Sequence, residues 1–129
     1  MYRQQDGGET YKLLLDWSKG PDSSERLATR LLPSEGYSSI DPSHPLGGPD
    51  GGKDALLQKD GLTLVLAVYF PNGQQSIKEI KDKFFLDFGG VKKNNATGFV
   101  FFTNQKVTLG ERTELQKIAG NVPVDLYHL

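Results

Sequence analysis

The loop from Gly47 to Asp54, GGPDGGKD, holds the densest set of residues that could take part in chemistry. Gly47, Gly52 and Lys53 match the phosphate-loop pattern G-x-x-x-x-G-K, in which backbone amides and a lysine hold phosphate groups. That pattern requires Ser or Thr at the next position and a helix after the loop, whereas this chain has Asp54 and then a strand-like segment. We therefore do not expect a phosphate loop. Two interpretations stay open, a glycine-rich turn and the edge of a metal site.

A metal site would be centred on Asp54, which stands where a predicted strand enters the sheet. Carboxylate oxygens suit hard divalent cations such as Mg²⁺. A bound cation lowers the pKa of its water and stabilises the charge that develops on a phosphate. Glu25, on a predicted helix, is the candidate for a further ligand or an orienting group. Asp50 is either an outer ligand or a residue that stabilises the turn.

The helices that would position these residues are marked by paired polar side chains at their starts. Such a pair, a capping box, satisfies free backbone amides in the first helical turn. The predicted helices cover 22–32, from 76 to a stop at Gly89-Gly90, and 108–119, with the boxes Asp22/Glu25, Ser76/Glu79 and Thr108/Glu111. A further short helix is predicted within 10–19.

The strands are predicted from apolar runs bounded by turn residues. They cover 37–41, a hairpin of 55–58 and 62–70 joined at Asp60-Gly61, then 98–103 and 124–129. The hairpin strands should pair antiparallel, and the strands linked by helices should pair parallel. The sequence therefore predicts an α/β domain with a mixed central sheet flanked by helices.

Composition narrows the class of protein. The 129 residues suit one domain, and the absence of cysteine excludes disulfides and thiolate zinc sites. The longest apolar run, 62–70, is less than half of the roughly 20 residues that a membrane helix needs, and the N-terminus has no apolar signal segment. We expect a cytoplasmic protein without membrane contact, a flexible segment 1–9 and a domain over 10–129. The abrupt end at Leu129 suggests part of a longer protein.

Several segments in order carry a family resemblance. SERLATRLL (24–32), GPDGGKDA (48–55), the apolar strand that ends in LAVYFP (66–71), and GFVFFTNQ (98–105) resemble the restriction-endonuclease-like PD-(D/E)XK family, and more closely its bacterial N-terminal modules. The resemblance covers about 10–129. It implies an αβββαβ core and Mg²⁺-dependent cleavage of nucleic acid, DNA first of all, in a bacterial defence-type protein. Glu25 resembles the acidic residue of the family's first helix, and Asp54 resembles its metal-binding aspartate.

The chain departs from the family pattern in its third strand. Active members carry Glu or Gln, any residue, and then Lys, whereas this chain has Ala67, Val68 and Tyr69. An alanine cannot bind a metal, and a tyrosine supplies no cation. The site is therefore either lost or moved. The candidates for moved groups lie just past the strand, and they are Gln74, Gln75 and Lys78, with Lys53 as another.

Two functions follow from this departure. The first is a metal-dependent nuclease that uses Asp54 and Glu25 with the moved groups. The second is a catalytically degenerate module that binds nucleic acid or a protein partner, including further domains of the same protein. The segment 72–106 carries six basic and three acidic residues and would be the face for nucleic acid. Such binding should weaken as salt rises.

Overall fold

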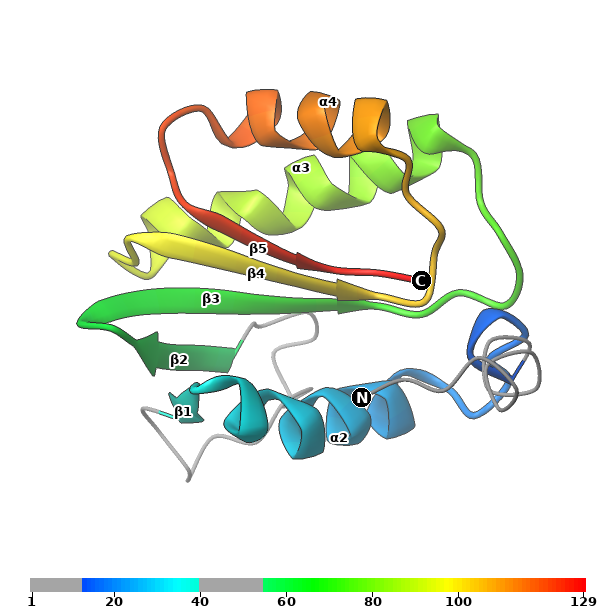
Figure 1. The fold of residues 1–129 in the computed structure, drawn as a ribbon, viewed down its shortest axis with the longest axis horizontal. Coiled ribbons are helices and arrows are strands. Elements are labelled where there is room, and N and C mark those ends of the chain that lie inside the picture. Colours follow the sequence, from blue (N-terminus) through cyan, green and yellow to red (C-terminus); the bar gives the residue numbers. More distant parts are fainter. Residues whose placement is uncertain (1–12, 40–54) are drawn as a thin grey trace.

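The structure is a computed structural model that describes residues 13–39 and 55–129. In this part of the chain the strands form one sheet and the helices pack against it (Figure 1). The elements are α2 (Pro21–Leu31), the 3₁₀ helix η1 (Leu32–Glu35), β1 (Ser38–Ser39), β2 (Ala55–Lys59), β3 (Leu62–Tyr69), α3 (Ile77–Lys93), β4 (Gly98–Thr103), α4 (Leu109–Ala119) and β5 (Val124–Tyr127). The protein is therefore a mixed α/β domain, as predicted.

The sheet has its described strands in the order β1-β2-β3-β4-β5. The pairs β1–β2 and β2–β3 are antiparallel, whereas the pairs β3–β4 and β4–β5 are parallel. The hairpin turn at Asp60 and Gly61 has φ angles of 52° and 78°, the left-handed region that a tight hairpin turn of this kind requires. The crossovers through α3 and α4 bring the following strands back in the same direction. The predicted mixed sheet is confirmed.

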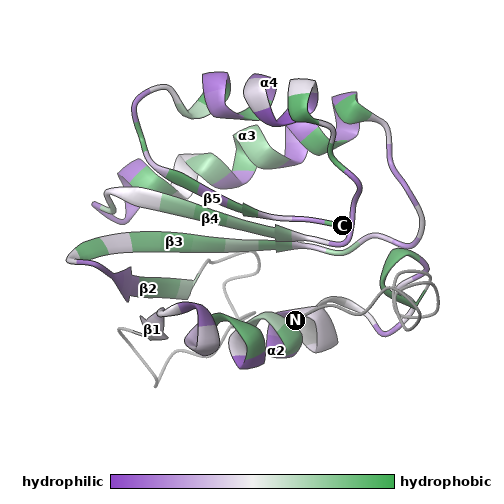
Figure 2. Cartoon of the chain, viewed as in Figure 1, coloured by the Kyte–Doolittle hydropathy of each residue, from purple (hydrophilic) through white to green (hydrophobic). Residues whose placement is uncertain are grey.

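Each face of the sheet is covered by helix, and each has its own apolar core (Figures 1 and 2). The alternation of side chains along β3 divides its residues between the two cores. Val65 and Ala67 point into the core beneath α3 and α4, where Phe84, Phe99 and Phe101 are fully buried. Leu64 and Leu66 point into the core beneath α2.

The predicted stop of the central helix at Gly89-Gly90 is wrong, because α3 continues to Lys93. Each glycine inside a helix costs about 1 kcal/mol relative to alanine. Val91, in the following turn, is 6% exposed and belongs to the core beneath α3, and burying a valine side chain contributes about 1.5–3 kcal/mol. The helix ends instead at Asn94, and Asn95 then takes a φ of 53°.

The first capping box is also wrong, because α2 begins at Pro21 and places Asp22 inside the helix. Proline at the first helical position is favourable, since its missing N–H would have no helical partner there. Gly20 precedes it with a φ of 85°. Pro33 lies inside the 3₁₀ helix η1, so helical backbone continues past it to Glu35. The last box is confirmed: Thr108 and Glu111 each accept a hydrogen bond from the other's backbone amide.

Three shorter predictions are only partly met. The segment predicted as a helix over 10–19 is helical only at 13–15 among its described residues, because Asp16 instead forms a β-bridge with Asn72. The strand predicted over 37–41 is described only at 38–39, with 40 and 41 outside the described residues. The last strand ends at Tyr127 rather than 129. Among the helices of the described part, none is long and apolar enough to cross a bilayer.

Candidate functional site

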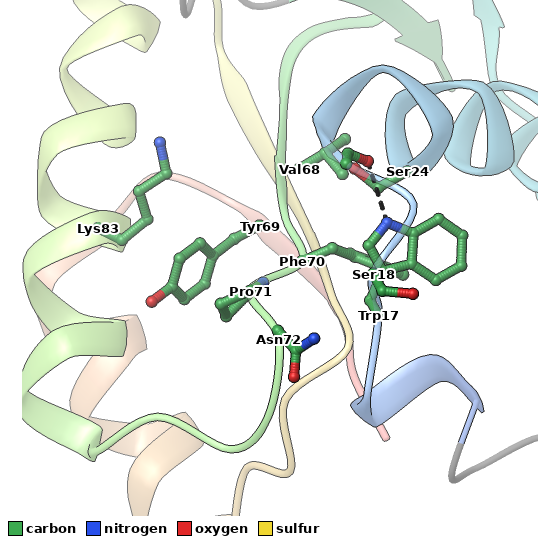
Figure 3. Close-up of a pocket in the computed structure, with 10 residues that line it drawn as sticks. Trp17, Ser18, Ser24, Val68, Tyr69, Phe70, Pro71, Asn72 and Lys83 are labelled. Atoms are coloured by element: carbon green, nitrogen blue, oxygen red, sulfur yellow. Dashed lines mark hydrogen bonds between the residues drawn. The ribbon is translucent and has the colours of Figure 1, made fainter.

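An open pocket of about 610 Å³ lies at the carboxyl end of β3 (Figure 3). It is built from the end of β3, the turn that follows, the start of α2, the segment before α2, and one side chain from α3. Its lining residues are Trp17, Ser18, Gly20, Ser24, Val68, Tyr69, Phe70, Pro71, Asn72 and Lys83. The carboxyl ends of strands in α/β folds are common places for binding sites. Tyr69, the last of the three strand positions compared with the nuclease pattern, lines this pocket.

Aromatic rings form one wall of the pocket. Trp17 packs edge-on against Phe70 with ring centroids 5.1 Å apart, and Phe70 stacks on Phe102 at 5.6 Å. The Trp17 indole N–H donates to the carbonyl of Gly20 at 3.0 Å (Figure 3). This bond joins the tryptophan to the N-terminal cap of α2. The wall is therefore a fixed apolar surface, with the exposed polar residues Ser18 and Asn72 beside it.

Ala67, which the sequence resemblance aligns with the metal ligand of active nucleases, is 2% exposed and lies in the core beneath α3. Tyr69, which the resemblance aligns with the lysine of active nucleases, is half-buried and packs against Phe101, with ring centroids 6.2 Å apart. Burial, and then the negative charge of Glu79, raise the pKa of the Tyr69 phenol above its ordinary value. The phenol therefore stays neutral and protonated, and it cannot act as the missing cation.

Gln74 and Gln75 use their side-chain amides to hold the turn between β3 and α3. The Gln74 carbonyl oxygen accepts from the Lys106 backbone N–H at 2.9 Å, and its NH₂ donates to the Lys106 carbonyl at 3.3 Å. The Gln75 NH₂ donates to the carbonyls of Gly73 and Asn72 at 3.1 and 3.4 Å. Both amides are thus placed in loop structure rather than in the pocket lining.

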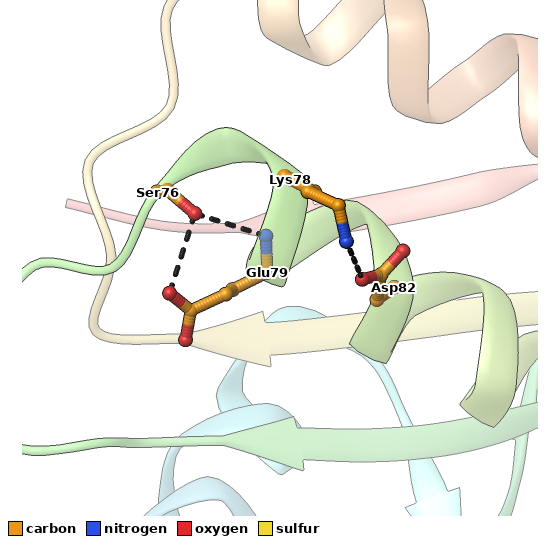
Figure 4. A network of polar contacts seen from close by, with 4 residues as sticks. All are labelled: Ser76, Lys78, Glu79 and Asp82. Atoms are coloured by element: carbon orange, nitrogen blue, oxygen red, sulfur yellow. Dashed lines mark hydrogen bonds and ion pairs between the residues drawn. The ribbon is translucent and has the colours of Figure 1, made fainter.

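Lys78 lies largely in solvent. Its side chain is 83% exposed, and its ammonium lies 3.0 Å from the Asp82 carboxylate on the next turn (Figure 4). The lysine that does line the pocket is Lys83, which sequence reasoning missed. Its spacing of four residues to Asp87 is a visible signal, since such pairs meet on one side of a helix. The two side chains are 3.1 Å apart.

Asp87 is the more deeply buried member of that pair, with a side chain only 10% exposed. Burial raises the pKa of the Asp87 carboxyl, and the Lys83 ammonium partly opposes this change. The ammonium at the edge of the pocket is therefore bound to a carboxylate of its own helix, which lowers its electrostatic effect on a ligand.

The pairing of the two predicted metal ligands, Glu25 and Asp54, stays a prediction, because only Glu25 is among the described residues. Glu25 is half-buried on α2, next to the pocket residue Ser24. Asp54 lies outside the described residues, as do Asp50 and Lys53. Within residues 13–39 and 55–129, no group of three His, Asp or Glu side chains is arranged to hold a metal ion.

A buried amide network closes the end of β4 beside the pocket. Asn104 and Gln105 are both fully buried. Asn104 donates to the carbonyls of Leu14 and Pro71 at 2.6 and 2.8 Å. Gln105 donates to the Gly73 carbonyl at 3.1 Å and accepts from the backbone of the same turn. This network fastens the segments at 14 and 71–75 to β4, so it supports the pocket without lining it.

A second polar cluster lies on the α2 face of the sheet. The Tyr37 hydroxyl donates to the Asp125 carboxylate and lies 3.1 Å from the Tyr127 hydroxyl. The Lys59 ammonium lies 4.5 Å from the centre of the Tyr37 ring. Burial and the hydrogen bond to Asp125 raise the pKa of the Tyr37 phenol. The cluster connects the chain before β1 with β5, and its contacts are those of a structural tie.

Comparison of the chain with protein-family models, with curated proteins and with solved structures finds no match in any of the three.

Proposed function

We propose that this chain is a restriction-endonuclease-like domain that has lost its catalytic groups and serves as a protein-binding module. The order α2, β1, β2, β3, α3, β4 supports the fold assignment, because the resemblance implies an αβββαβ core. Helices on both faces of a mixed sheet support it as well. The fold, on this proposal, is kept as a scaffold.

The observation that carries the proposal is the state of Ala67. The family's metal ligand must reach solvent and a cation, whereas this position is 2% exposed and packed in the core with Ile80 and Phe84. An alanine there supplies packing and no ligand atom. Tyr69, two residues on, supplies a neutral phenol. Losing both groups removes most of the electrostatic stabilisation on which metal-dependent phosphate chemistry depends.

The charges of α3 favour a protein partner over nucleic acid. The basic excess of 72–106 lies largely on α3, and three of its lysines are neutralised by carboxylates. Lys78 pairs with Asp82, Lys81 with Glu114 and Lys83 with Asp87, at 3.0, 3.0 and 3.1 Å. Binding to nucleic acid depends on cations that can replace the counterions of phosphates. A paired lysine presents less net positive charge to a phosphate, because a carboxylate lies beside it.

The pocket supports the same conclusion. Its wall is aromatic, with Trp17 and Phe70, and its rim carries the uncharged polar side chains of Ser18 and Asn72. Aromatic anchors with a polar rim are the composition of protein interfaces, where a partner's side chain fills the recess. On this proposal the pocket receives a side chain of a protein partner or of another domain of the same protein.

Site-specific photo-crosslinking in cells tests this proposal. A photoreactive phenylalanine analogue is placed at Ser18 or Asn72 on the pocket rim, with exposed Lys117 on α4 as the matched control position. We expect a discrete protein adduct from the rim positions and none from the control. Equal adducts from all three positions, or none from the rim, would contradict the pocket as a docking site.

Fluorescence anisotropy with labelled DNA and RNA oligonucleotides tests whether nucleic acid is the partner instead. We expect no binding that depends on salt, because three of the five α3 lysines lie beside carboxylates. Binding whose affinity falls steeply as salt rises would contradict a protein-only module and favour nucleic acid.

Metal-dependent cleavage of nucleic acid is the second candidate, and Lys83 is the observation that favours it. This ammonium lines the same pocket as Tyr69, so a lysine is present near the site although it comes from α3. In this case Asp54 and Glu25 would hold Mg²⁺. Incubation with DNA and RNA in Mg²⁺ or Mn²⁺ tests it: cleavage by the wild type that is lost in both Asp54→Ala and Lys83→Met would support an enzyme.

A further inference from the structure

The side of α3 that faces away from the sheet carries two large apolar side chains. Phe85 is 69% exposed and Leu86 is 72% exposed. Exposed apolar neighbours of this size are a common sign of an interaction surface. They lie in the middle of the 17-residue helix, with charged residues toward both of its ends.

Four residues form a line along the exposed side of this helix, and we call them the α3 stripe: Asp82, Leu86, Gly89 and Lys93. Their spacing of four, three and four residues keeps them on one side of a helix with 3.6 residues per turn. All four are exposed. From the start of the helix, the stripe therefore presents an acidic residue, a large apolar residue, a glycine and a basic residue.

This order is self-complementary when a second copy of the helix runs in the opposite direction. Antiparallel alignment that sets residue 82 opposite residue 93 also sets residue 86 opposite residue 89. Asp82 then faces Lys93 of the second copy, and Leu86 faces the bare backbone at Gly89. Two-fold symmetry repeats both contacts, as an isologous interface requires.

We propose that α3 forms the interface of a homodimer, in which two copies of the α3 stripe pack antiparallel in this register. We assign a second copy of this chain as the partner, because the stripe is complementary to the same stripe running in the opposite direction. Opposite charges then face each other at its ends, and a large side chain faces a glycine at its centre. Phe85 flanks the stripe and extends its apolar area. Antiparallel helices also set the positive N-terminal end of each beside the negative C-terminal end of the other.

The space needed at Gly89 is present in the single chain. A Cβ atom built at this glycine would meet no atom within 4 Å, its chain neighbours and the nearby backbone of its own helix aside. Glycine inside a helix is otherwise unfavourable, and within its own chain no close contact requires it here. A leucine from a second copy can approach the backbone closely at this point, as small residues allow wherever two helices cross at short distance.

The charged ends of the stripe are available for such contacts. Asp82 binds Lys78 of its own helix, but both side chains are largely exposed, at 68% and 83% (Figure 4). Exposed pairs of this kind are weak, so Asp82 can accept a second cation. The Lys93 ammonium forms no ion pair with any residue of the described part.

Sedimentation equilibrium over a concentration series measures this dimer in the wild-type chain. We expect the average mass to rise from 14.2 kDa toward twice that value. Leu86→Glu should weaken the association at least about tenfold, as loss of a central apolar contact does in other interfaces. Leu109→Glu is the matched control, since Leu109 is 81% exposed on α4 and outside the stripe; it should leave the association unchanged.

Charge exchange tests the antiparallel register. Asp82→Lys alone and Lys93→Asp alone should each be monomeric, because each places like charges opposite one another. A mixture of the two variants should form a heterodimer, and the double variant should recover the homodimer. Recovery by mixing does not follow from misfolding or from nonspecific apolar association.

Gly89→Gln separates the interface from folding. Glutamine is a better helix former than glycine, so the monomer should be at least as stable as the wild type. Its side chain would occupy the place of the second copy's Leu86, so dimerisation should weaken. A wild-type chain that stays monomeric throughout the series, or a dimer that Leu86→Glu and Gly89→Gln leave intact, would overturn the proposal.

Discussion

Replacing Ala67 by glutamate introduces the residue type that the proposed nuclease resemblance would place there, and it should destabilise the fold. The side chain is 2% exposed, so the new carboxyl has no route to solvent without opening the core. If it stays buried and protonates, the cost at pH 7 is about 4 kcal/mol, since each pH unit above the ordinary glutamate pKa corresponds to ~1.4 kcal/mol. Overpacking adds about 1–3 kcal/mol.

Urea unfolding followed by the fluorescence of Trp17, the single tryptophan, measures this loss. Gln58→Glu is the matched control, because Gln58 is exposed on the neighbouring strand β2. It should change the free energy of unfolding by less than about 0.5 kcal/mol.

The pH dependence of Ala67→Glu identifies the cause. Burial raises the pKa of a carboxyl in the folded state, so the folded protein binds the proton more tightly than the unfolded chain. The charge cost is therefore present at neutral pH and is removed as the pH falls toward the ordinary glutamate value. A variant as stable as the wild type at pH 7, or one whose loss does not shrink on acidification, would refute the burial of position 67.

Three further predictions concern the polar contacts. Gln105→Ala removes the buried partner of the turn before α3, so it should cost about 1–3 kcal/mol for each group left unpaired and speed hydrogen exchange of the Gln75 amide. Tyr37→Phe removes the hydrogen bond to the Asp125 carboxylate and should lower the free energy of unfolding by about 1.5–3 kcal/mol in urea titrations. For Asp87, burial raises the pKa of the carboxyl, so its ionisation costs stability as the pH rises through the folded-state pKa. The stability of Asp87→Asn relative to the wild type should therefore increase as the pH rises above the ordinary aspartate pKa, in parallel thermal melts. A difference that stays constant with pH would contradict the buried carboxyl.

The parts of the fold that local chemistry determines could be predicted from the sequence. Asp60 and Gly61 specify a tight hairpin turn, and Thr108 with Glu111 specifies a helix start. In both cases the signal and the structure lie within a few residues. The strand directions followed from connection lengths, which are also visible in the sequence.

The errors lie where distant contacts outweigh local preference. Gly89-Gly90 is a local stop signal, but burial of Val91 against the sheet carries α3 through it. The segment before Gly20 has helical composition, yet a bridge from Asp16 to Asn72 takes it out of the helix. Neither contact can be read from the neighbouring residues.

The candidate site was harder to predict than the fold for the same reason. That Ala67 and Tyr69 supply neither a metal ligand nor a cation was visible in the sequence. That Lys83 rather than Lys78 reaches the pocket depends on which side of α3 turns toward β3. The structural use of Gln74 depends on Lys106, thirty-two residues further along the chain.

Calorimetric titration of Mg²⁺ and Mn²⁺ into the wild type and into Asp54→Ala tests the central claim most directly. A domain that has lost its catalytic groups should show no metal binding that depends on this carboxylate, so the two titrations should coincide. Saturable binding by the wild type that disappears in Asp54→Ala would contradict this account and show that the metal site is retained.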